Sequence, residues 1–576
     1  MSLTSSLLTA SSGLLNTQYQ IAITNTNVSN AGETGYTKKT YSATSVSSAT
    51  GSTFTAGQVE RTVNTYLSKT VVAKNAELGA ARTINDYLAS YDTMVGQVDG
   101  GTDLSSMIDT LQASISALSA SADSESAKSQ VLADLEGLTT QISALSAQVQ
   151  SLRTEAEGDI ADTVAAINDG LSLIASLNDQ IVSLASNGAD VTGLEDQRDA
   201  ALVELSSLIG ISYYTTSDNQ VQVYTQSGSL LLGVDGAVTL DYTAAGRLDA
   251  AVSYPDTLSG ITLNGRDITG TLTSGELGAL LSLRDDFLVG EQEKLDALAG
   301  ALIAQINDAA NASSTYPPPN SLTSAGTVAA SDSFSATGSI RIAITGTDGT
   351  LVSTQDLDLG GITTIADLVT ALNGISGVSA SVSSDGKLVV AASSASQGIV
   401  IAGIDESVGA EGDGFSSYFG FNDILTGTDA RSIGLVSAMS DDPSLLPTAT
   451  LADTLTVGAK ALTAADNSGV MRLAEALTGD ISFEAAGGFS ARTASLADYA
   501  ASIVSAAATM ISTAETTLET AQDSYDYVSN LLTNQTAVNI DEEIARLTLF
   551  QNQYEATAQL ISITQELFDT LINMVK

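Results

Sequence analysis

Three residue types are missing from this 576-residue sequence, which has no cysteine, no histidine and no tryptophan. Without cysteine there are no disulfides, thiolate nucleophiles or Cys/His zinc sites, and without histidine there is no Ser-His-Asp triad. The acidic pairs that remain, such as Asp285 with Asp286 and Glu542 with Glu543, are interpreted as solvated helix charges. We therefore expect a protein that is not an enzyme and has no catalytic, cofactor or metal site.

Basic residues are scarce, because 21 Lys and Arg stand against 66 Asp and Glu and give a net charge of −45. Such a charge repels phosphate backbones and anionic lipid surfaces, so nucleic acid is not expected as a partner. No apolar run reaches the roughly 18 residues of a membrane span, and the N-terminus lacks the basic region of a cleaved signal peptide. We expect no membrane partner and no cleaved signal peptide.

Aromatic residues are also rare, at 5%, and the six prolines are confined to positions 255, 317–319, 443 and 447. This composition favours long helices packed through small side chains over one thick core. Apolar positions at helical spacing from Leu135 to Leu184 predict one very long helix, with Asn187 and Gly188 as its C-terminal cap. The length of the chain allows three or four domains, and we expect an elongated molecule.

The C-terminal stretch, residues 539–576, has the clearest helical pattern in the chain. Its apolar residues recur at alternating steps of four and three, which predicts a helix with a coiled-coil seam. A second apolar stripe follows the seam over residues 560–574, so this end is expected to contact several neighbours. Asn539 is the predicted N-cap, and the acidic residues 541–543 suit the positive end of the helix dipole.

The first thirty residues repeat the four-three spacing, from Leu3 to Val28, and predict a second helix with its own seam. A single amphipathic helix at a chain end is more often an ordinary core element. Matching seams at both ends of one chain favour packing of the two ends against each other. We therefore expect these two helices to be partners.

A run of Asn, Ser and Gly, residues 27–39, is expected to end the first helix. This run resembles the signature Asn-x-Ser-Asn followed by Gly-Tyr-Thr of the flagellar rod, hook and hook-associated protein family. The matching residues are Asn27, Ser29, Asn30, Gly35, Tyr36 and Thr37. Lys38 and Lys39 depart from the signature and are interpreted as surface charges. Segments 193–214, 274–302 and 538–571 resemble the same family, in particular its members at the junction between hook and filament.

The resemblance, together with the sequence periods, predicts a multidomain, elongated fold. Its expected core is mainly α, made of long coiled-coil-like helices formed from both termini, with inserted β-rich (α+β) domains. The spacing changes to period two from residue 211, and a short helix is predicted over 365–373. The expected domains are a terminal coiled-coil domain (1–60 with 538–576), a long-helix bundle (61–210 with 480–537), a β-rich domain with a following helix (211–316) and a second inserted α+β domain (317–479).

The function implied by the resemblance is structural: an axial protein of the bacterial flagellum that joins hook to filament. The implied partners are copies of itself in a ring, the hook protein, the next hook-associated protein towards the filament, and a cytoplasmic export chaperone on the C-terminal helix. The implied location is extracellular, after export by the flagellar type III secretion apparatus. Two alternatives stay open: flagellin or the neighbouring hook-associated protein, and a secreted adhesin or enzyme with coiled-coil ends.

The terminal helices and the signature between them form the expected assembly interface. Its residues are Leu3, Leu7, Leu14, Ile21, Asn27, Val28, Asn30, Gly35, Tyr36, Ile544, Leu547, Gln551, Tyr554, Ala558, Ile561, Gln565, Phe568, Leu571 and Ile572.

Overall fold

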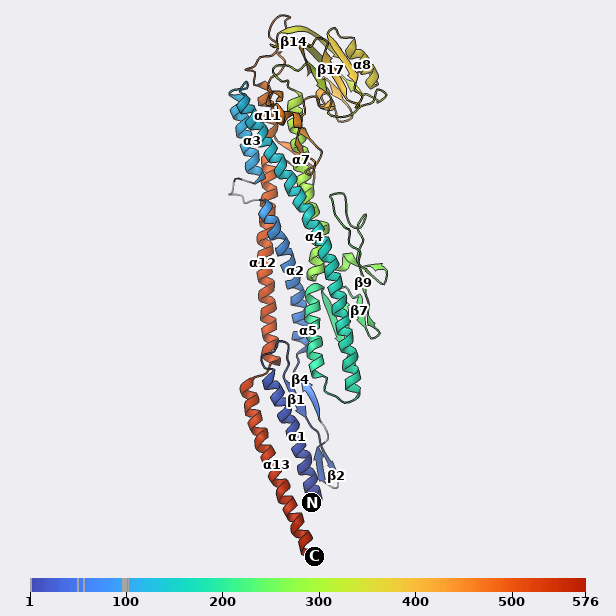
Figure 1. Ribbon diagram of the computed structural model, residues 1–576, viewed down its shortest axis with the longest axis vertical. Coiled ribbons are helices and arrows are strands. Elements are labelled where there is room, and N and C mark those ends of the chain that lie inside the picture. The colour runs from blue at the N-terminus through green and yellow to red at the C-terminus, as the bar shows by residue number, and fades with distance from the viewer. Residues whose placement is uncertain (1–2, 49–50, 55–56, 96–100, 102, 576) are drawn as a thin grey trace.

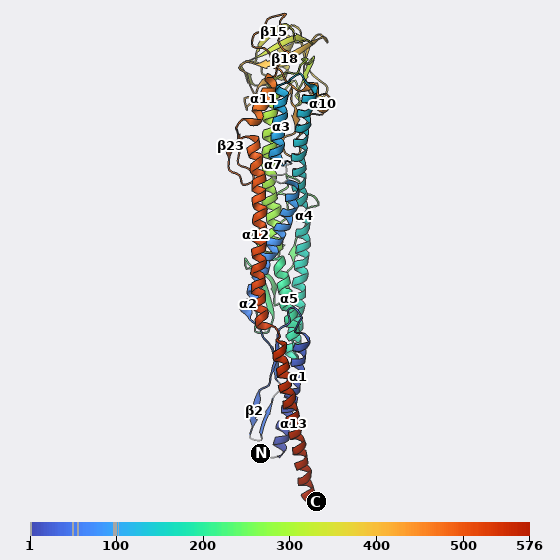
Figure 2. The ribbon, with the colours of Figure 1, turned by 90° about the vertical axis from the view of Figure 1, so that its left-hand side faces the viewer.

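The structure is a computed structural model that describes residues 3–48, 51–54, 57–95, 101 and 103–575. Long helices lie side by side along the longest axis, and both chain ends lie at the same end of the molecule (Figure 1, Figure 2). Helices account for 54% of the structure, and each sheet has only two to four strands. The predicted mainly α fold with β-rich insertions is therefore confirmed.

A bundle of long helices, here called the body, forms the centre of the molecule (Figure 1). Asp103, Ser124 and Ser495 each cap a helix by accepting a hydrogen bond from a backbone N–H of its first turn. Such caps satisfy donors that a helix start leaves unpaired. The helices of the body are α2 (Thr65–Val95), α3 (Leu104–Ser119), α4 (Glu125–Ser186), α5 (Thr192–Leu208), α6 (Gly275–Ser282), the π-helical turn η2 (Leu283–Phe287), α7 (Leu288–Asn311), α11 (Ser468–Thr478) and α12 (Leu496–Thr536).

The core of the body follows α4, the 62-residue helix that the apolar spacing predicts. Asn187 caps its C-terminus and Gly188 has a left-handed φ of 73°, as expected from the sequence. By length and composition α4 could cross a membrane, but the core helix of a protein in water meets the same criterion. It packs here against α3, α5 and α7. Its large apolar residues with 0% exposure are Leu138, Ile142, Val149, Ile160, Ile167, Leu171, Ile174 and Ile181.

A β-rich region lies beside the body and begins at residue 211, where the period-two pattern predicts a strand. Antiparallel sheets have the strand orders β5-β6-β7-β8 and β11-β10-β9. Arg153 of α4 joins this region to the bundle, because its guanidinium donates to the carbonyl oxygens of Asp249 (3.1 Å) and Val252 (2.7 Å). The elements are β5 (Ile211–Thr215), β6 (Val221–Thr225), β7 (Leu230–Gly233), β8 (Gly236–Ala237), β9 (Leu240–Asp241), β10 (Thr262–Leu263), β11 (Arg266–Asp267) and η1 (Thr269–Thr271).

A second inserted region lies at the end of the molecule opposite the chain termini (Figure 1). It has its own apolar core between residues 322 and 421, whereas Leu425 and Ile433 join the core of the body. The predicted short helix over 365–373 is α8 (Ile365–Asn373). The other elements between residues 321 and 445 are β12 (Ser321–Thr323), β13 (Ala336–Thr337), β14 (Ser339–Gly346), β15 (Leu351–Asp358), β16 (Val378–Val382), β17 (Leu388–Ala392), β18 (Gln397–Gly403), β19 (Ser407–Val408), α9 (Phe415–Phe419), β20 (Leu425–Thr426), β21 (Gly434–Leu435), α10 (Ser437–Asp441) and η3 (Pro443–Leu445). The antiparallel pair of β22 (Ile481–Phe483) and β23 (Arg492–Ala494) instead lies beside α12, where Phe483 stacks on Tyr499 (Figure 2).

The two ends of the chain pack side by side as the helices α1 (Leu3–Ser29) and α13 (Ile540–Val575) (Figure 1, Figure 2). The helix α13 begins where the sequence predicts, because the backbone N–H groups of residues 541 and 542 donate to Asn539 Oδ1 at 3.0 and 3.3 Å. Lys576, placed in the predicted helix, lies outside the described residues. The expected pairing of the two end helices is confirmed.

Two short pairs of antiparallel strands accompany α1. They are formed by β1 (Lys39–Ser42) with β4 (Gln58–Arg61), and by β2 (Ser45–Ser48) with β3 (Gly51–Phe54). The sequence does not predict these strands, because four residues are too few to establish a period of two. We call α1, β1–β4 and α13 together the terminal module.

Candidate assembly interface

The helices α1 and α13 contact each other along a narrow face that mixes polar and apolar side chains. The buried residues of α1 are Ser5, Thr17, Thr24 and Asn27. Glu543 and Thr564 are buried on α13. Half-buried residues of α13 recur on the same face at steps of three and four. They are Leu547, Phe550, Tyr554, Thr557, Ile561 and Phe568.

This face is rotated relative to the predicted seam of α13. Leu547, Tyr554, Ala558, Ile561 and Phe568 are half-buried, and so are the predicted seam residues of α1, namely Leu3, Leu7, Leu14, Ile21 and Val28. Gln551, Gln565, Ile544 and Ile572 are instead exposed, the last two by 49% and 53%. The prediction that these four contact the partner helix within the chain is therefore wrong.

The rotation has a physical reason. Both stripes of α13 are apolar enough to be buried, so the spacing alone does not choose between them. Small side chains of α1 that face α13, among them Ser5, Thr17 and Thr24, are buried there. A Cβ added at Gly13 would lie 3.9 Å from Thr557 Cγ2, and Gln18 Nε2 donates to Tyr554 Oη at 3.4 Å. Contact of the four exposed residues with other copies of the chain stays a prediction.

A large apolar surface of the terminal module has no partner within the described chain. The exposed apolar residues of α1 without such a partner are Leu8 (58%) and Leu15 (55%), whereas Tyr19 (56%) stacks on Tyr41 of β1. Those of α13 are Ile540, Ile544, Leu549, Leu560, Ile563, Leu567, Leu571, Ile572 and Met574, each between 43% and 75% exposed. Helix α1 also contains no charged residue. Exposed apolar patches of this kind mark interaction sites.

Asn27 joins four segments of the chain and is 1% exposed. Its Nδ2 donates to the backbone oxygen of Lys39 (2.8 Å) and to Glu543 Oε2 (2.9 Å). Its Oδ1 accepts hydrogen bonds from the Lys39 backbone N–H and from Tyr36 Oη, both at 3.0 Å. Both amide protons and the carbonyl oxygen are thus used, and this explains the choice of Asn at a buried position.

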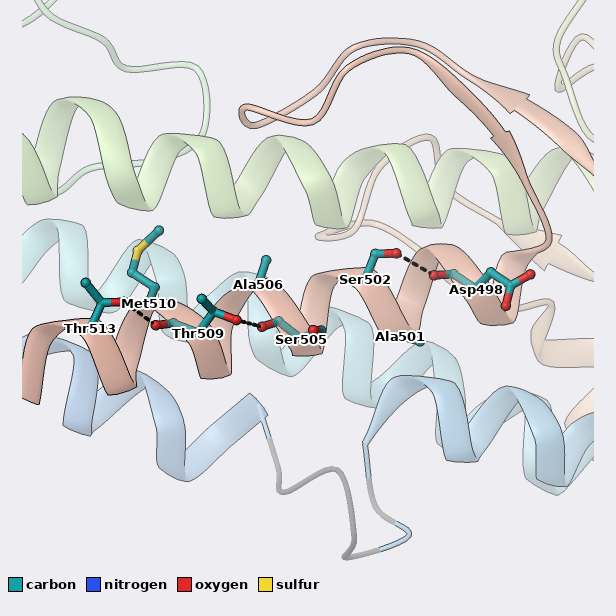
Figure 3. Close-up of a pocket in the computed structure, with 8 residues that line it drawn as sticks. All are labelled: Asp498, Ala501, Ser502, Ser505, Ala506, Thr509, Met510 and Thr513. Atoms are coloured by element: carbon teal, nitrogen blue, oxygen red, sulfur yellow. Dashed lines mark hydrogen bonds between the residues drawn. The ribbon is translucent and has the colours of Figure 1, made fainter.

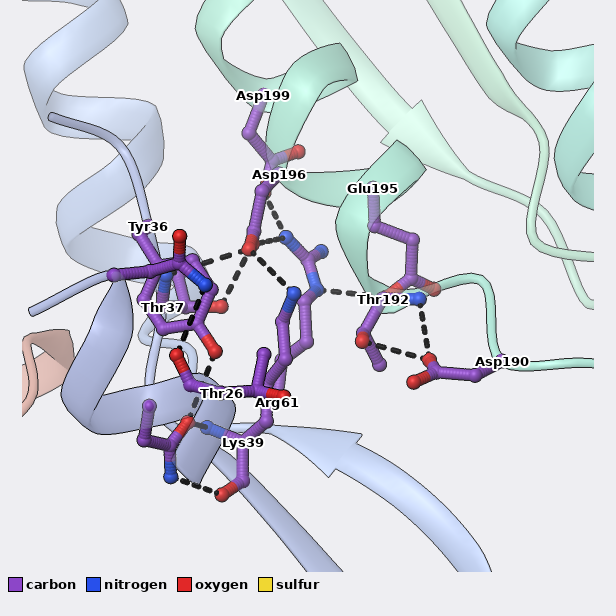
Figure 4. A network of polar contacts seen from close by, with 12 residues as sticks. Thr26, Tyr36, Thr37, Lys39, Arg61, Asp190, Thr192, Glu195, Asp196 and Asp199 are labelled. Atoms are coloured by element: carbon purple, nitrogen blue, oxygen red, sulfur yellow. Dashed lines mark hydrogen bonds and ion pairs between the residues drawn. The ribbon is translucent and has the colours of Figure 1, made fainter. Parts of the chain in front are cut away.

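The Gly-Tyr-Thr part of the signature directs the chain from α1 towards α5. Gly35 has a left-handed φ of 82°, which a residue with a side chain rarely adopts. Burial and the nearby charge of Asp196 raise the pKa of Tyr36 to about 12, so its hydroxyl stays a donor. Thr37 Oγ1 donates to Asp196 Oδ1 at 2.6 Å (Figure 4). Asn30, also predicted at the interface, donates to the carbonyl oxygen of Thr26 at 2.9 Å.

The two lysines that follow the signature are not plain surface charges, and that interpretation is wrong. Lys38 Nζ lies 3.0 Å from Glu542 Oε2 and 3.4 Å from Glu543 Oε1, so it joins β1 to the first turn of α13. Lys39 is 7% exposed, because its Nζ pairs with Asp196 (3.4 Å) and lies 4.5 Å from the ring centre of Tyr36. Both lysines therefore connect parts of the structure that are far apart in the sequence.

Arg61, at the end of β4, reaches three carboxylates on one side of α5 (Figure 4). Its guanidinium lies 2.7 Å from Glu195, 2.8 Å from Asp196 and 2.9 Å from Asp199. Burial disfavours the charged guanidinium, but Asp199, Asp196 and Glu195 together raise the pKa of Arg61 above its ordinary value. Burial raises the pKa of the Asp199 carboxyl, and Arg61 opposes that shift. We call Lys39, Arg61, Glu195, Asp196 and Asp199 the ionic cluster.

Sequence reasoning did not assign the ionic cluster or Glu543 to the interface. The available signal was the segment 193–214, whose resemblance to the flagellar family includes the three carboxylates of α5. Arg198 of the same segment donates to Asn178 Oδ1 (3.0 Å) and to the backbone oxygen of Asn219 (2.6 Å), which ties α5 to α4 and the β-rich region. The charges in this segment therefore connect structural parts.

A groove runs along one face of α12 (Figure 3). Its hydroxyl groups serve the helix itself, because Ser502, Thr509 and Thr513 each donate to the backbone carbonyl four residues earlier. Among the residues that the structure describes, no group of three or more acidic side chains could hold a metal ion. The groove is thus a surface of small side chains.

Three family models match this chain, and all three describe flagellar proteins. The model "Flagellar hook-associated protein FlgK helical domain" matches residues 88–316, "Flagellar basal body rod FlgEFG protein C-terminal" matches residues 533–574, and "Flagellin hook IN motif" matches residues 339–394. The first covers most of the body and the second covers α13.

Curated relatives agree with these models. The chain is 24% identical to Flagellar hook-associated protein 1 of Salmonella typhimurium, over 52% of this chain and 55% of that protein. It is 27% identical to the Bacillus subtilis protein of the same name, over 40% of this chain and 47% of that protein. The chain thus spans about half the length of the curated relatives it matches. A solved structure, the flagellar hook junction protein FlgK from Burkholderia pseudomallei, is 17% identical with a TM-score of 0.47, over 81% of this chain and 100% of that one.

The proteins that these matches name are flagellar proteins. Among them, the hook-associated proteins are the ones that the curated relatives share, and residues 88–316 are similar to the helical domain of those proteins.

Proposed function

We propose that this chain is a structural subunit of the flagellar axis that joins the hook to the filament and assembles into a ring through its terminal helices. The proposal includes an elongated subunit whose α1 and α13 form coiled-coil contacts with neighbouring copies. The matches to hook-associated protein 1 support the place in the flagellum.

The observation that carries the proposal is the unpartnered apolar surface of the terminal module. Leu560 and Leu567 are 57% and 51% exposed, although each is a residue type usually buried in a folded chain. Burial of such surface contributes roughly 25 cal/mol per Å², so contact with other copies would stabilise both helices.

The form of this surface supports a ring. The apolar residues of α1, among them Leu8 and Leu15, lie on a different helix from those of α13. Contact between the α13 of one copy and the α1 of the next would join two different surfaces. Such heterologous contacts repeat from copy to copy and close into rings or continue as helical arrays.

The partners in this proposal are further copies of the chain, the hook protein on one side and the next hook-associated protein on the other. A cytoplasmic export chaperone would cover the exposed stripe of α13 before export by the flagellar type III secretion apparatus, and the mature subunit would be extracellular. The proposed role is non-enzymatic. It requires no cofactor, no nucleic acid and no membrane.

Flagellin is the main alternative, because it also has paired terminal helices. The signature containing Gly35, Tyr36 and Thr37 favours the rod, hook and hook-associated proteins over flagellin. A secreted adhesin or enzyme would require a ligand pocket in the inserted regions, and the sequence contains no motif for one.

The position of labelled subunits on intact flagella tests the proposal. We expect a single short band at the far end of the hook, and label along the whole filament would instead indicate flagellin. The double variant Ile563→Ser with Leu567→Ser should fail to restore filament growth in cells that lack the intact chain. Ile404→Ser, which alters a 47% exposed residue of the second inserted region, is the control and should restore growth.

A further inference from the structure

A pocket of about 610 Å³ opens in the body where α2, α7 and α12 meet beside the π-helical turn η2. Its apolar wall includes Ile84 of α2, Phe287 of η2 and Met510 of α12. Single turns of π-helix occur frequently at functional sites. The pocket belongs to the body, and the contacts proposed for the terminal module do not involve it.

Two carboxylates of this pocket have no cationic partner among the residues that the structure describes. They belong to Asp286 and Glu293, and both side chains are exposed. The other acidic residues of the pocket are paired, since Asp285 lies 2.7 Å from Arg284 and Glu291 forms an ion pair of 2.6 Å inside the body. The pocket thus combines an apolar wall with two uncompensated negative charges. This combination suits an arginine, which has an apolar stem and binds carboxylates well.

The loop between β22 and β23 fixes one of these carboxylates in place. The backbone N–H of Gly487 donates to Glu293 Oε2 at 2.8 Å. Gly487 also packs on the backbone of Gly290, where a side chain at position 487 would clash. The loop is anchored to α12, because the rings of Phe483 and Tyr499 stack with their centres 3.8 Å apart. Glu293 is therefore ordered before a partner binds, which lowers the entropy cost of binding.

An exposed arginine lies at the tip of the β10–β11 hairpin in the β-rich region. Leu263 pairs with Arg266 across this hairpin, and the turn residues Asn264 and Gly265 have positive φ angles of 52° and 75°. Two successive residues of this kind form a tight turn that suits a hairpin. Arg266 forms no ion pair within the described part of the chain, and its side chain is exposed. The hairpin thus presents an unpaired positive charge at a well-defined tip.

The hairpin and the pocket lie at the same level of the molecule but on different sides. Tyr254 connects the hairpin to η2, because its Oη donates to Asp267 Oδ2 at 3.1 Å and its ring centre lies 6.0 Å from the guanidinium carbon of Arg284. Arg284 and Asp286 both belong to η2. Figure 1 shows the β-rich region on one side of the body and α12, which lines the pocket, on the other. Copies that stand side by side would therefore bring the hairpin of one to the pocket of the next.

We propose that the β10–β11 hairpin of one copy docks into the pocket of a second copy of this chain, where Arg266 pairs with Asp286 and Glu293. The contact joins two different surfaces, so it can repeat from copy to copy around a ring. It rests on the proposed assembly into a ring and adds a second contact to that assembly. This contact lies in the body and fixes how neighbouring bodies stand against each other.

Charge reversal in the full chain tests this contact in cells that lack the intact chain. Arg266→Glu and Asp286→Arg should each lower the number of filaments that stay attached under shear by about tenfold, because each replaces an attraction by a repulsion. The double variant Arg266→Glu with Asp286→Arg exchanges the two charges and should restore attachment. Arg247→Glu and Asp218→Arg are the controls, because they reverse exposed charges of the β-rich region outside the hairpin and the pocket, and they should not change attachment.

Unchanged attachment in both single variants would overturn the contact, and so would a double variant as weak as the single ones. Circular dichroism of the purified variants checks their helix content. If Asp286→Arg lowers that content, the neutral variant Asp286→Asn with Glu293→Gln takes its place, and unchanged attachment there would equally overturn the contact. The proposed function is judged separately, because it fails only if labelled subunits do not form a band at the far end of the hook.

Discussion

The body and the terminal module both contain helices with regularly spaced apolar residues, but these residues are buried in the body and exposed in the module. In α4 of the body, apolar residues at helical spacing are fully covered, and Ile142 and Ile167 are 0% exposed. In α13 of the module, residues at comparable spacing stay in contact with solvent, and Leu560 and Met574 are 57% and 75% exposed. Apolar spacing therefore predicts that a helix forms. It does not predict whether other parts of the same chain bury the apolar face of that helix.

The difference concerns polar groups as well. The body contains a charged pair sealed in its interior, since Arg284 and Glu157 have side-chain exposures of 0% and 2% and lie 2.7 Å apart. The charges of the module lie mainly at its junction with the body, and α1 has none. The body thus stabilises itself, whereas the module depends on the junction and, in our proposal, on other copies.

The largest expected effect on stability concerns the sealed pair. Arg284→Met leaves Glu157 buried without its cationic partner, and removal of one member of a buried pair costs about 3–5 kcal/mol. We expect this loss in the free energy of unfolding of the body, measured by urea titration with circular dichroism. Arg61→Met is the comparison, because it leaves Glu195, Asp196 and Asp199, whose side chains are 14%, 9% and 39% exposed, with less cationic compensation, and it should cost less than Arg284→Met. Equal losses would show that the module and the body unfold as one unit.

A matched pair of leucines gives the next effect in size. Leu138→Ala removes a side chain of α4 with 0% exposure and should cost about 2–5 kcal/mol, through lost burial and the cavity left behind. Leu567→Ala makes the same chemical change at a 51% exposed position of α13 and should cost less than about 0.5 kcal/mol in the isolated subunit. The comparison fails if the two losses, measured by urea titration, are similar.

Features that depend on local sequence patterns could be predicted from the sequence. The apolar positions of α4, the cap at Asn539 and the helix Ile365–Asn373 follow from local patterns, and the structure has all three where they are predicted. Local patterns suffice there because each signal lies within a few helical turns.

The junction could not be predicted for the opposite reason. Arg61 and Asp196 are 135 residues apart, and Asn27 and Glu543 are 516 residues apart. No period connects such partners, so the sequence predicts an exposed Lys39, whereas the structure pairs this residue with Asp196. The sequence also does not predict which face of α13 contacts α1, because two adjacent apolar stripes have the same spacing.

A smaller effect concerns the helices at the two chain ends. We expect the free energy that keeps them folded in the monomer to be close to zero. Pairing of α1 with α13 closes a loop of roughly 500 residues, and helices with little tertiary burial are marginal. We expect limited proteolysis of the monomer to remove about the first 30 and the last 30 residues while the body stays intact. The trimmed product should stay soluble and fail to join hook to filament. Fully helical, protease-resistant ends in a verified monomer would contradict this expectation.

The smallest expected effect on the subunit comes from the double variant Gln551→Leu with Gln565→Leu. Both glutamines are exposed on α13, so the free energy of unfolding of the monomer should change by less than about 0.5 kcal/mol. If both positions contact neighbouring copies, leucine there should strengthen self-association and make it less specific, because a polar residue on a helix seam sets register at a cost in stability. Sedimentation velocity measures the first effect, and the spread of oligomer sizes measures the second. Unchanged association would mean that both side chains face water in the assembled ring. The apolar contact between copies would then have to come from residues such as Leu560 and Leu567.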